Sequence, residues 1–406
     1  MRWFLATAFL PTLLANASPV DFHHHVHHEE HNETLRLFRR VRTGPNGELL
    51  DPKTASDLFL LDSGPGGCIG REGTLDPWVE EAMLLHSAVE TAYANIRGDR
   101  SWMLLWLTWF GVQLNMQTGD VDLSDEANKR LWETIGDHIS RVTRFLSGAG
   151  LQNPDVPGEN PRIFCGPEAG VVQPWRNSVV RDREGRDVVA FEDPETGARE
   201  YLTLGDAFVE PANNPKARAF WFDSFNGYDL DYGGEDSLCA EDPVDGRRRY
   251  AKVARPASSW PPIFTDDAEF EFGRANRHIL FCPPSFEPGG SHSYPSLARA
   301  IDEDYYPTAG LRDVSQALDR MLTVSATMYH ELYHLTDADN TPDVSYNLNT
   351  IVQNAQNPDT REANSHNPET YTYFAMAAYL LLRAPDGEEP CLYMGGLPKR
   401  ASNPFA

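Results

Sequence analysis

Basic residues and cysteines are scarce in this sequence, and the chain lacks any long apolar run. Its 406 residues include 35 Lys and Arg against 60 Asp and Glu, which gives a formal net charge of −25 at pH 7. Such a surface repels phosphate groups, so we do not expect nucleic acid as a partner. The charge fits a secreted protein that accepts basic substrates, or it serves only to keep the chain in solution. A hydrophobic fraction of 41% excludes wholesale disorder.

The few cysteines are widely spaced and form no C-x-x-C motif. They are Cys68, Cys165, Cys239, Cys282 and Cys391. The odd number allows at most two disulfides and leaves one thiol, and the sequence alone does not give the pairing.

Membrane-spanning segments are not expected. The most apolar stretch within the chain, Trp102–Val112, is too short to cross a bilayer and predicts a buried helix instead. The N-terminus has Arg2, an apolar run from Trp3 to Leu14 and the small-x-small sequence Ala15-Asn16-Ala17. This pattern is typical of a secretory signal over residues 1–17, so we predict an extracellular protein whose disulfides form on secretion. We also expect a monomer.

Residues 18–74 are predicted to be a His-rich extension. The tract Asp21–His31 reads DFHHHVHHEEH, and Asn32 begins a glycosylation sequon. Cleavage at the dibasic pair Arg39-Arg40 would make this extension a pro-segment. Two interpretations of the tract stay open, namely capture of zinc or copper and a solvated, protonatable tail.

The remaining pattern predicts an α+β fold that is predominantly helical and has a small antiparallel or mixed sheet. Apolar residues at helical spacing predict helices over residues 76–96, 102–114, 125–146, 313–334 and 369–383. Short β-like runs, at residues 162–165, 188–191, 200–204, 220–222 and 278–282, predict strands. We therefore predict a domain over residues 75–394 with inserted loops at about 166–273, followed by a flexible tail over 395–406.

The sequence around Met328–Asn347 carries the clearest chemical signal. His330, Glu331 and His334 form an H-E-x-x-H motif. Residues four apart share one face of a helix, so the two imidazoles can bind one metal ion. Glu331 lies beside them, where it can act on a metal-bound water. This arrangement is typical of zinc peptidases.

A peptidase zinc needs a third protein ligand and one open position. The metzincin extension is absent, because Asp337 and Asn340 stand where its glycine and third histidine would be. Asp343, nine residues after His334, is the nearest candidate for the third ligand. Glu362 and Glu369 are alternatives, in the manner of thermolysin.

A family resemblance favours Asp343. The segment Asn340-Thr341-Pro342-Asp343-Val344-Ser345-Tyr346-Asn347 resembles the G-T-x-D-x-x-Y-G motif of the aspzincins, the fungal deuterolysins and peptidyl-lysine metalloendopeptidases. Asparagine, which tolerates left-handed backbone, replaces both glycines. Asn367–Ala375 is similar to the family's Asn-Ala-Asp and Tyr-Phe-Ala segments, and the resemblance extends over about residues 279–382.

The resemblance implies a zincin-like metallopeptidase that holds one Zn²⁺ through His330, His334 and Asp343. Glu331 would be the general base, and the Tyr346 hydroxyl would donate to the developing oxyanion. Protein or peptide substrates would be its partners. Glu369 and Thr372 stand where lysine-directed members place an aspartate and a glutamate against the residue after the scissile bond. A single remaining acid predicts a preference for basic residues without strict lysine specificity.

Two other hypotheses remain. The chain is similar to secreted zinc-scavenging antigens related to the aspzincins, which predicts zinc binding without peptidase activity. Those relatives have arginine where this chain has Glu331, so the glutamate favours catalysis. A degenerate peptidase retained as an adhesin is the third hypothesis, and no feature of the sequence supports it.

Overall fold

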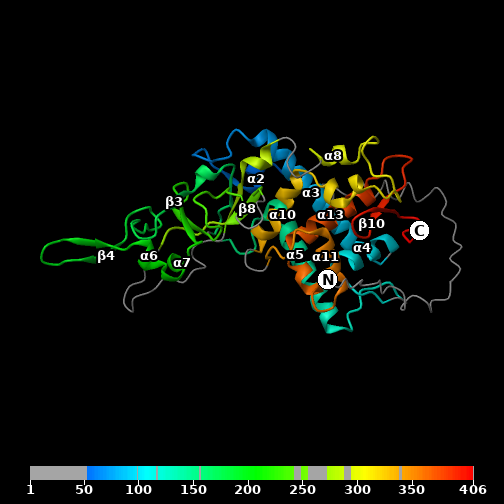
Figure 1. The fold of residues 1–406 in the computed structure, drawn as a ribbon, viewed down its shortest axis with the longest axis horizontal. Coiled ribbons are helices and arrows are strands. Elements are labelled where there is room, and N and C mark those ends of the chain that lie inside the picture. The colour runs from blue at the N-terminus through cyan, green and yellow to red at the C-terminus, as the bar shows by residue number, and fades with distance from the viewer. Residues whose placement is uncertain are drawn as a thin grey trace, which may run out of the picture.

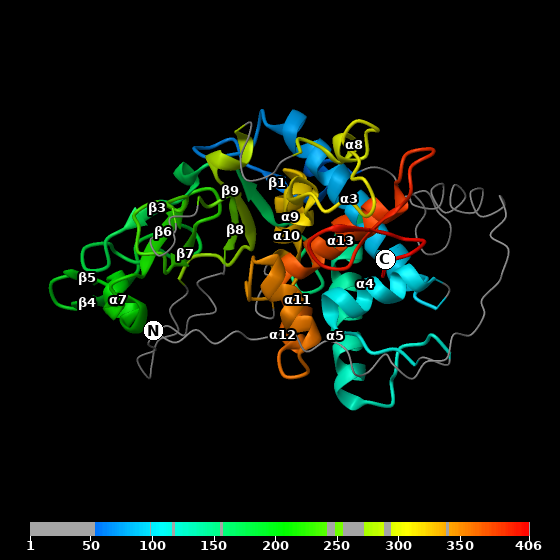
Figure 2. The ribbon, with the colours of Figure 1, turned by 45° about the vertical axis from the view of Figure 1, so that its right-hand side comes forward.

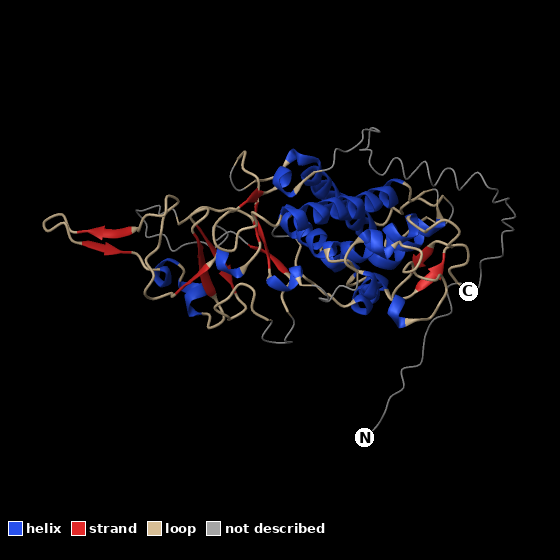
Figure 3. Cartoon of the chain, turned by 90° about the horizontal axis from the view of Figure 1, so that it is seen from above, coloured by secondary structure: helices blue, strands red, loops and turns tan. Residues whose placement is uncertain are grey.

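The computed structural model describes residues 53–97, 99–115, 118–154, 157–241, 248–254, 272–287, 294–337 and 341–405. The predicted signal, the His-rich tract, the Asn32 sequon, the Arg39-Arg40 pair and Asn340 lie outside the described residues. The described part is α+β, as predicted, with a helical body at one end and a strand-rich lobe at the other (Figures 1 and 3).

Helices from distant parts of the sequence form the body. They are α3 (Glu72–Ala94), α4 (Arg100–Phe110), α5 (Glu126–Arg144), α10 (Ser325–Thr336), α11 (Leu348–Gln356), α12 (Arg361–Ser365) and α13 (Pro368–Leu382). Neighbouring residues cap both ends of α4. The Asp99 side chain accepts a hydrogen bond from Ser101 N at its start, and Gly111, at φ 69°, ends the helix. Trp106 and Trp109 are fully buried, which confirms that α4 is central. Burial of such large rings dominates the energetics of this core.

Two helix predictions need correction. The first helix begins at Glu72, before the predicted Asp76, and Pro77 lies in its second turn, where the helix lacks one backbone hydrogen bond. Asp76 does not cap the helix, because its carboxylate accepts a hydrogen bond from the Ala55 amide at 2.8 Å. The predicted helix over 313–334 is three pieces: a 3₁₀ turn (Val314–Gln316), α9 (Leu318–Met321) and α10. Leu322 has extended backbone and Thr323 pairs with Tyr294 in a β-bridge. A tertiary contact therefore interrupts a pattern that locally favours helix.

A mixed four-stranded sheet lies beside the helices. Its order is β1 (Leu60–Leu61), β2 (Arg162–Phe164), β9 (His278–Phe281) and β8 (Ala251–Ala254). The first three strands are parallel, and β8 is antiparallel to β9. Because side chains alternate across a sheet, Ile279 faces the helical core while Leu280 faces the lobe. The β1 pairing also places folded structure before residue 75, where the apolar run is too short to show a period.

The lobe is the material that the sequence predicted as inserted loops. Its sheet has the order β3 (Val171–Gln173), β6 (Arg218–Phe222) and β7 (Gly227–Asp231). Phe220 and Phe222 of β6 pack with Phe164 and Leu280 of the main sheet. The hairpin of β4 (Val189–Glu192) and β5 (Arg199–Tyr201) projects from the lobe, with α6 (Leu204–Ala207) and α7 (Val209–Asn213) near its base (Figure 1).

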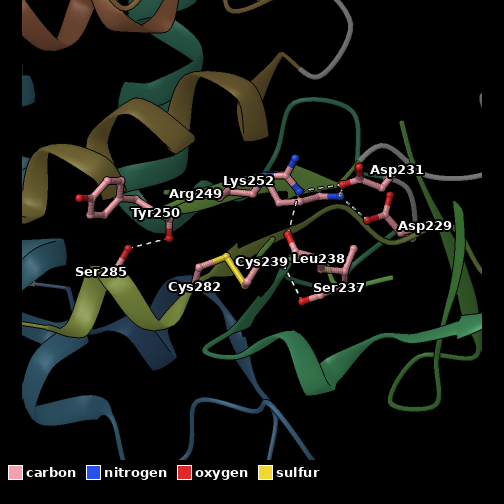
Figure 4. Close-up of a disulfide and its surroundings, with 10 residues drawn as sticks. All are labelled: Asp229, Asp231, Ser237, Leu238, Cys239, Arg249, Tyr250, Lys252, Cys282 and Ser285. Carbon is pink, nitrogen blue, oxygen red and sulfur yellow. Dashed lines mark hydrogen bonds and ion pairs between the residues drawn. A yellow bond between two sulfur atoms is a disulfide. The ribbon is translucent and has the colours of Figure 1, made fainter. Parts of the chain in front are cut away.

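A disulfide and a buried ion cluster join the lobe to the main sheet (Figure 4). Cys239 bonds to Cys282, directly after β9. Lys252 Nζ on β8 lies 2.8 Å from an Asp229 carboxylate oxygen and 2.9 Å from one of Asp231. Burial opposes the charge of Asp231, but Lys252 and Arg249 together lower its pKa to about 2. The lobe is thus fixed to β8, the strand that borders α10.

The second disulfide joins Cys68 to Cys165, and Cys391 is a free buried thiol. Two bridges and one remaining thiol confirm the count expected from five cysteines.

The predicted flexible tail needs correction, because β11 (Pro398–Arg400) pairs with β10 (Cys391–Tyr393). Short elements complete the described part: α2 (Ala55–Leu58), α8 (Leu297–Ala300) and single turns at Phe145–Ala149, Pro167–Ala169 and Pro283–Phe286. Within the described residues, no helix has the length and apolarity to cross a membrane.

His278 on β9 should make stability depend on pH. Burial lowers its pKa from 6.5 to about 4, although Asp229 opposes the shift and Lys252 and Arg162 add to it. As the pH falls, His278 therefore gains its proton at a higher pH in the unfolded chain than in the folded protein. We expect the free energy of unfolding to drop by about 3 kcal/mol between pH 6.5 and 4 on account of this residue.

Urea unfolding of wild type and His278→Leu at several pH values measures this contribution. Leucine does not titrate and packs well against the surrounding phenylalanines. Between pH 6.5 and 4, the free energy of unfolding of the variant should therefore fall by about 3 kcal/mol less than that of wild type. An identical pH slope in both proteins would contradict the assignment.

Candidate metal centre

Helix α10 presents the H-E-x-x-H motif toward the N-terminus of α13, and the two helices lie side by side in the body (Figure 2). The four-residue spacing puts His330 and His334 on one face, with ring centroids 5.0 Å apart. The His330 side chain is 7% exposed and that of His334 is 15% exposed. The helical placement predicted for the motif is confirmed.

The predicted third ligand joins them. His330 Nε2 lies 3.2 Å from His334 Nε2, and each of these atoms lies 3.1 Å from Asp343 Oδ1. Of all the described residues, only these three form a His, Cys, Asp or Glu group that could hold a metal ion. The side chain of Asp343 is 35% exposed, so the cluster opens to solvent on that side. Glu362, the alternative, is an exposed residue of α12 outside this group.

The donor set fits zinc. Ligands at 2.0–2.1 Å in a tetrahedron lie roughly 3.3–3.4 Å apart, close to the separations seen here. Without a metal, ring protons can join these atoms by hydrogen bonds. When all three atoms offer lone pairs, a cation must lie between them to offset their repulsion. Two imidazoles and one carboxylate, with an open side, match the ligands of a catalytic zinc site.

A buried carboxylate fixes the orientation of His330. Nδ1 of His330 lies 2.9 Å from Oε2 of Glu369, which is 8% exposed. A carboxylate accepts, so Nδ1–H donates, and Nε2 of the neutral ring keeps its lone pair for a metal. Burial alone would lower the pKa of His330, but without a metal the ring can donate hydrogen bonds to Asp343 and Glu369, and these raise its pKa well above the usual value. Histidines that bind metals are commonly held in this way.

This contact gives Glu369 a role that differs from the predicted selection of basic substrates. We expect Glu369→Gln to weaken zinc binding by about 10- to 100-fold, because glutamine is a poorer acceptor for Nδ1–H. Zinc titration against a competing chelator measures the loss. If the variant instead keeps its zinc affinity and loses only a preference for basic peptides, the predicted substrate role holds and this one fails.

Asp343 is ionised in this setting. Burial opposes its charge, but hydrogen bonds from His330 and His334 outweigh it and hold the pKa of Asp343 well below its usual range. The aspartate therefore presents an anionic oxygen to the centre at any pH near neutrality.

Glu331 lies next to the cluster and is 5% exposed. Its Oε2 is buried and has no hydrogen-bond partner among the described residues. Burial raises the pKa of Glu331, and His330 and His334 are near enough to oppose that shift. A buried carboxylate with a free oxygen and a raised pKa can take up and release a proton.

Tyr346 lies at the open side of the cluster. Its ring stacks on His330, with centroids 5.7 Å apart, and 48% of the residue is exposed. Burial of the hydroxyl raises the pKa of Tyr346, and the nearby charge of Asp343 raises it further. The hydroxyl therefore stays protonated. Thr372 has a different place, because it is 1% exposed and its hydroxyl donates to the Pro368 carbonyl within α13. The structure does not present Thr372 on an open surface.

Sequence reasoning missed the residues that support the ligands. Asp337, which the sequence marked only as replacing the metzincin glycine, is 6% exposed, and its carboxylate lies 2.9 Å from His138 and 3.1 Å from Arg141 of α5. It ties the C-terminal end of α10 to α5. Asn367 is the N-cap residue of α13, but its side chain makes no capping hydrogen bond and binds the Asp343 loop instead. A polar residue at a helix end can cap the helix or contact a distant loop. A single sequence does not show which of the two it does.

Comparisons with known proteins add one partial relative. No family model matches the chain, and no solved structure matches it. Over 147 residues it is 56% identical to a protein described as the non-secreted LysM effector LysM17 of Penicillium expansum. The match covers 36% of this chain and 19% of the effector, so the chain spans about a fifth of that relative. A match of this extent does not show the family.

Proposed function

We propose that this protein is a zinc-dependent endopeptidase of the aspzincin type. The observation that carries the proposal is the convergence of His330 Nε2, His334 Nε2 and Asp343 Oδ1 within 3.2 Å of one another, beside a buried Glu331 with a free oxygen. In this proposal the α+β body is a zincin-like fold, with a single zinc ion held by those three residues. Proteins or peptides are the substrates.

The chain's own residues have distinct roles in the proposed reaction. Zinc bound here would lower the pKa of a coordinated water from 15.7 to about 7. Glu331 accepts the proton of the attacking water and returns it to the leaving amine. The Tyr346 hydroxyl donates to the carbonyl oxygen as it gains negative charge, a contact worth about 100- to 1000-fold in rate. Glu369 keeps the tautomer of His330 that exposes Nε2.

We further propose that the protein acts outside the cell. Two disulfides support an oxidising compartment, and the N-terminal sequence predicts export. The name of the Penicillium relative describes a non-secreted effector, but the chain covers only 19% of that protein, so this name does not decide the compartment.

Zinc storage or scavenging without catalysis is the second candidate function. The three-ligand cluster alone supports it equally well. Glu331 separates the two functions, because a buried carboxylate with a raised pKa costs stability and contributes nothing to a site that only holds zinc.

Cleavage of casein and of a mixed peptide library tests the proposal. The purified protein should cut peptide bonds, 1,10-phenanthroline should stop the reaction, and added Zn²⁺ should restore it. The cut sites then show whether basic residues are preferred. Stoichiometric zinc binding without any cleavage would favour the scavenging function.

A further inference from the structure

The loop that carries Asp343 has little backbone support of its own. Among the described residues, no backbone-to-backbone hydrogen bond involves Pro342 to Tyr346. Side chains hold the loop instead. Thr341 donates to the carbonyl of Tyr333, and the Tyr373 hydroxyl donates to the Tyr346 carbonyl at 3.4 Å. The position of the third ligand therefore depends on side-chain contacts.

Asn367 makes the central contacts to this loop. Its Oδ1 accepts from the backbone amides of Val344 at 3.2 Å and Ser345 at 3.5 Å. Its Nδ2 donates to the Ser345 carbonyl at 2.9 Å and to the Thr370 hydroxyl at 3.1 Å. Asn367 is completely buried, so these contacts are shielded from water. A buried amide with all these partners fixes the loop far better than a solvated one.

We propose that Asn367 is the positioning residue that sets the third ligand, a role that rests on the proposed metal site. Asn367 and Glu369 both stand at the N-terminus of α13. One holds the loop of Asp343 and the other holds the ring of His330. A single rigid helix end thereby places two of the three ligands, and Asn367 sets how tightly zinc binds.

Asn364 provides a matched control. It is also an asparagine, is equally buried, and lies three residues away on α12. Its Nδ2 donates to the carbonyls of Trp109 and Ile351, which belong to the helical body. Asn364→Ala therefore removes a buried amide of the same kind without touching the loop.

The experiment compares zinc affinity, thermal unfolding and amide exchange in wild type, Asn367→Ala, Asn367→Asp and Asn364→Ala. We expect Asn367→Ala to weaken Zn²⁺ binding by about 10- to 100-fold and to speed exchange of the Val344 and Ser345 amides in the zinc-free protein. Asn367→Asp keeps the acceptor and loses the donor to Ser345, so its loss should be intermediate. Asn364→Ala should lower the melting temperature but leave zinc affinity within about threefold of wild type.

Each outcome decides the proposal. Unchanged affinity and amide exchange in Asn367→Ala would overturn it, and so would an equal loss of affinity in Asn364→Ala. Wild type that binds zinc without cleaving peptides would refute the proposed peptidase, while the affinities still decide the role of Asn367. If wild type binds no zinc, the metal site fails, and the exchange rates of Val344 and Ser345 decide whether Asn367 holds the loop.

Discussion

Glu331→Gln should lower the rate of peptide cleavage by about 100- to 10,000-fold and leave zinc affinity almost unchanged. The two side chains have the same shape, but glutamine cannot accept the proton of the attacking water. Glu331 is not among the residues that converge on the centre, so its replacement removes no ligand. Values of kcat/KM and zinc titrations on the same preparations measure both effects.

The control for this variant is Glu362→Gln. Glu362 is an exposed acid on α12, and the sequence offered it as an alternative third ligand. Its replacement should change neither rate nor affinity. Full activity in Glu331→Gln would remove the proposed base, and an equal loss in Glu362→Gln would indicate a nonspecific effect of charge.

Asp343→Ala should weaken zinc binding by roughly 100- to 1000-fold. A zinc site with four ligands is worth about 10–16 kcal/mol, so one ligand accounts for about 3 kcal/mol. Without Asp343, only two imidazoles remain on α10, and cleavage should fall in parallel because the centre is empty at ordinary zinc concentrations. Competition with a chelator of known affinity gives the constant.

The matched control is Asp359→Ala, which removes an exposed aspartate from the turn before α12. It should bind zinc as wild type does. Wild-type affinity in Asp343→Ala would show that the metal is held elsewhere, and the assignment of the third ligand would then be wrong.

Large periodic elements could be predicted from the sequence because burial and local propensity agree in them. The central helix α4, the strand β9 and the helix α13 lie close to where their patterns predict. The break at Leu322 and Thr323 could not be predicted, because a bridge to Tyr294, distant in sequence, competes with helix formation. Helix α11 was not predicted, although the Asn347 side chain caps it by accepting a hydrogen bond from Thr350 N.

The convergence of His330, His334 and Asp343 could be predicted because it depends on spacing along one helix and on a short motif nearby. The supporting contacts could not. Glu369 reaches His330 across 39 positions of sequence, and Asp337 reaches His138 across a larger gap. Which polar groups pair at such distances follows from the packing of α10 against α5 and α13, and one sequence does not contain that information. For this reason the contact of Glu369 with His330 could not be predicted, and its predicted contact with substrate stays a prediction.

Titration of metal-stripped wild type with Zn²⁺, following peptide cleavage and zinc uptake in the same samples, tests the central claim most directly. The account predicts that cleavage rises in proportion to zinc bound and reaches its maximum at one zinc per chain. Tight uptake of one zinc with no cleavage at any point of the titration would contradict the account and leave a zinc-binding protein without peptidase activity.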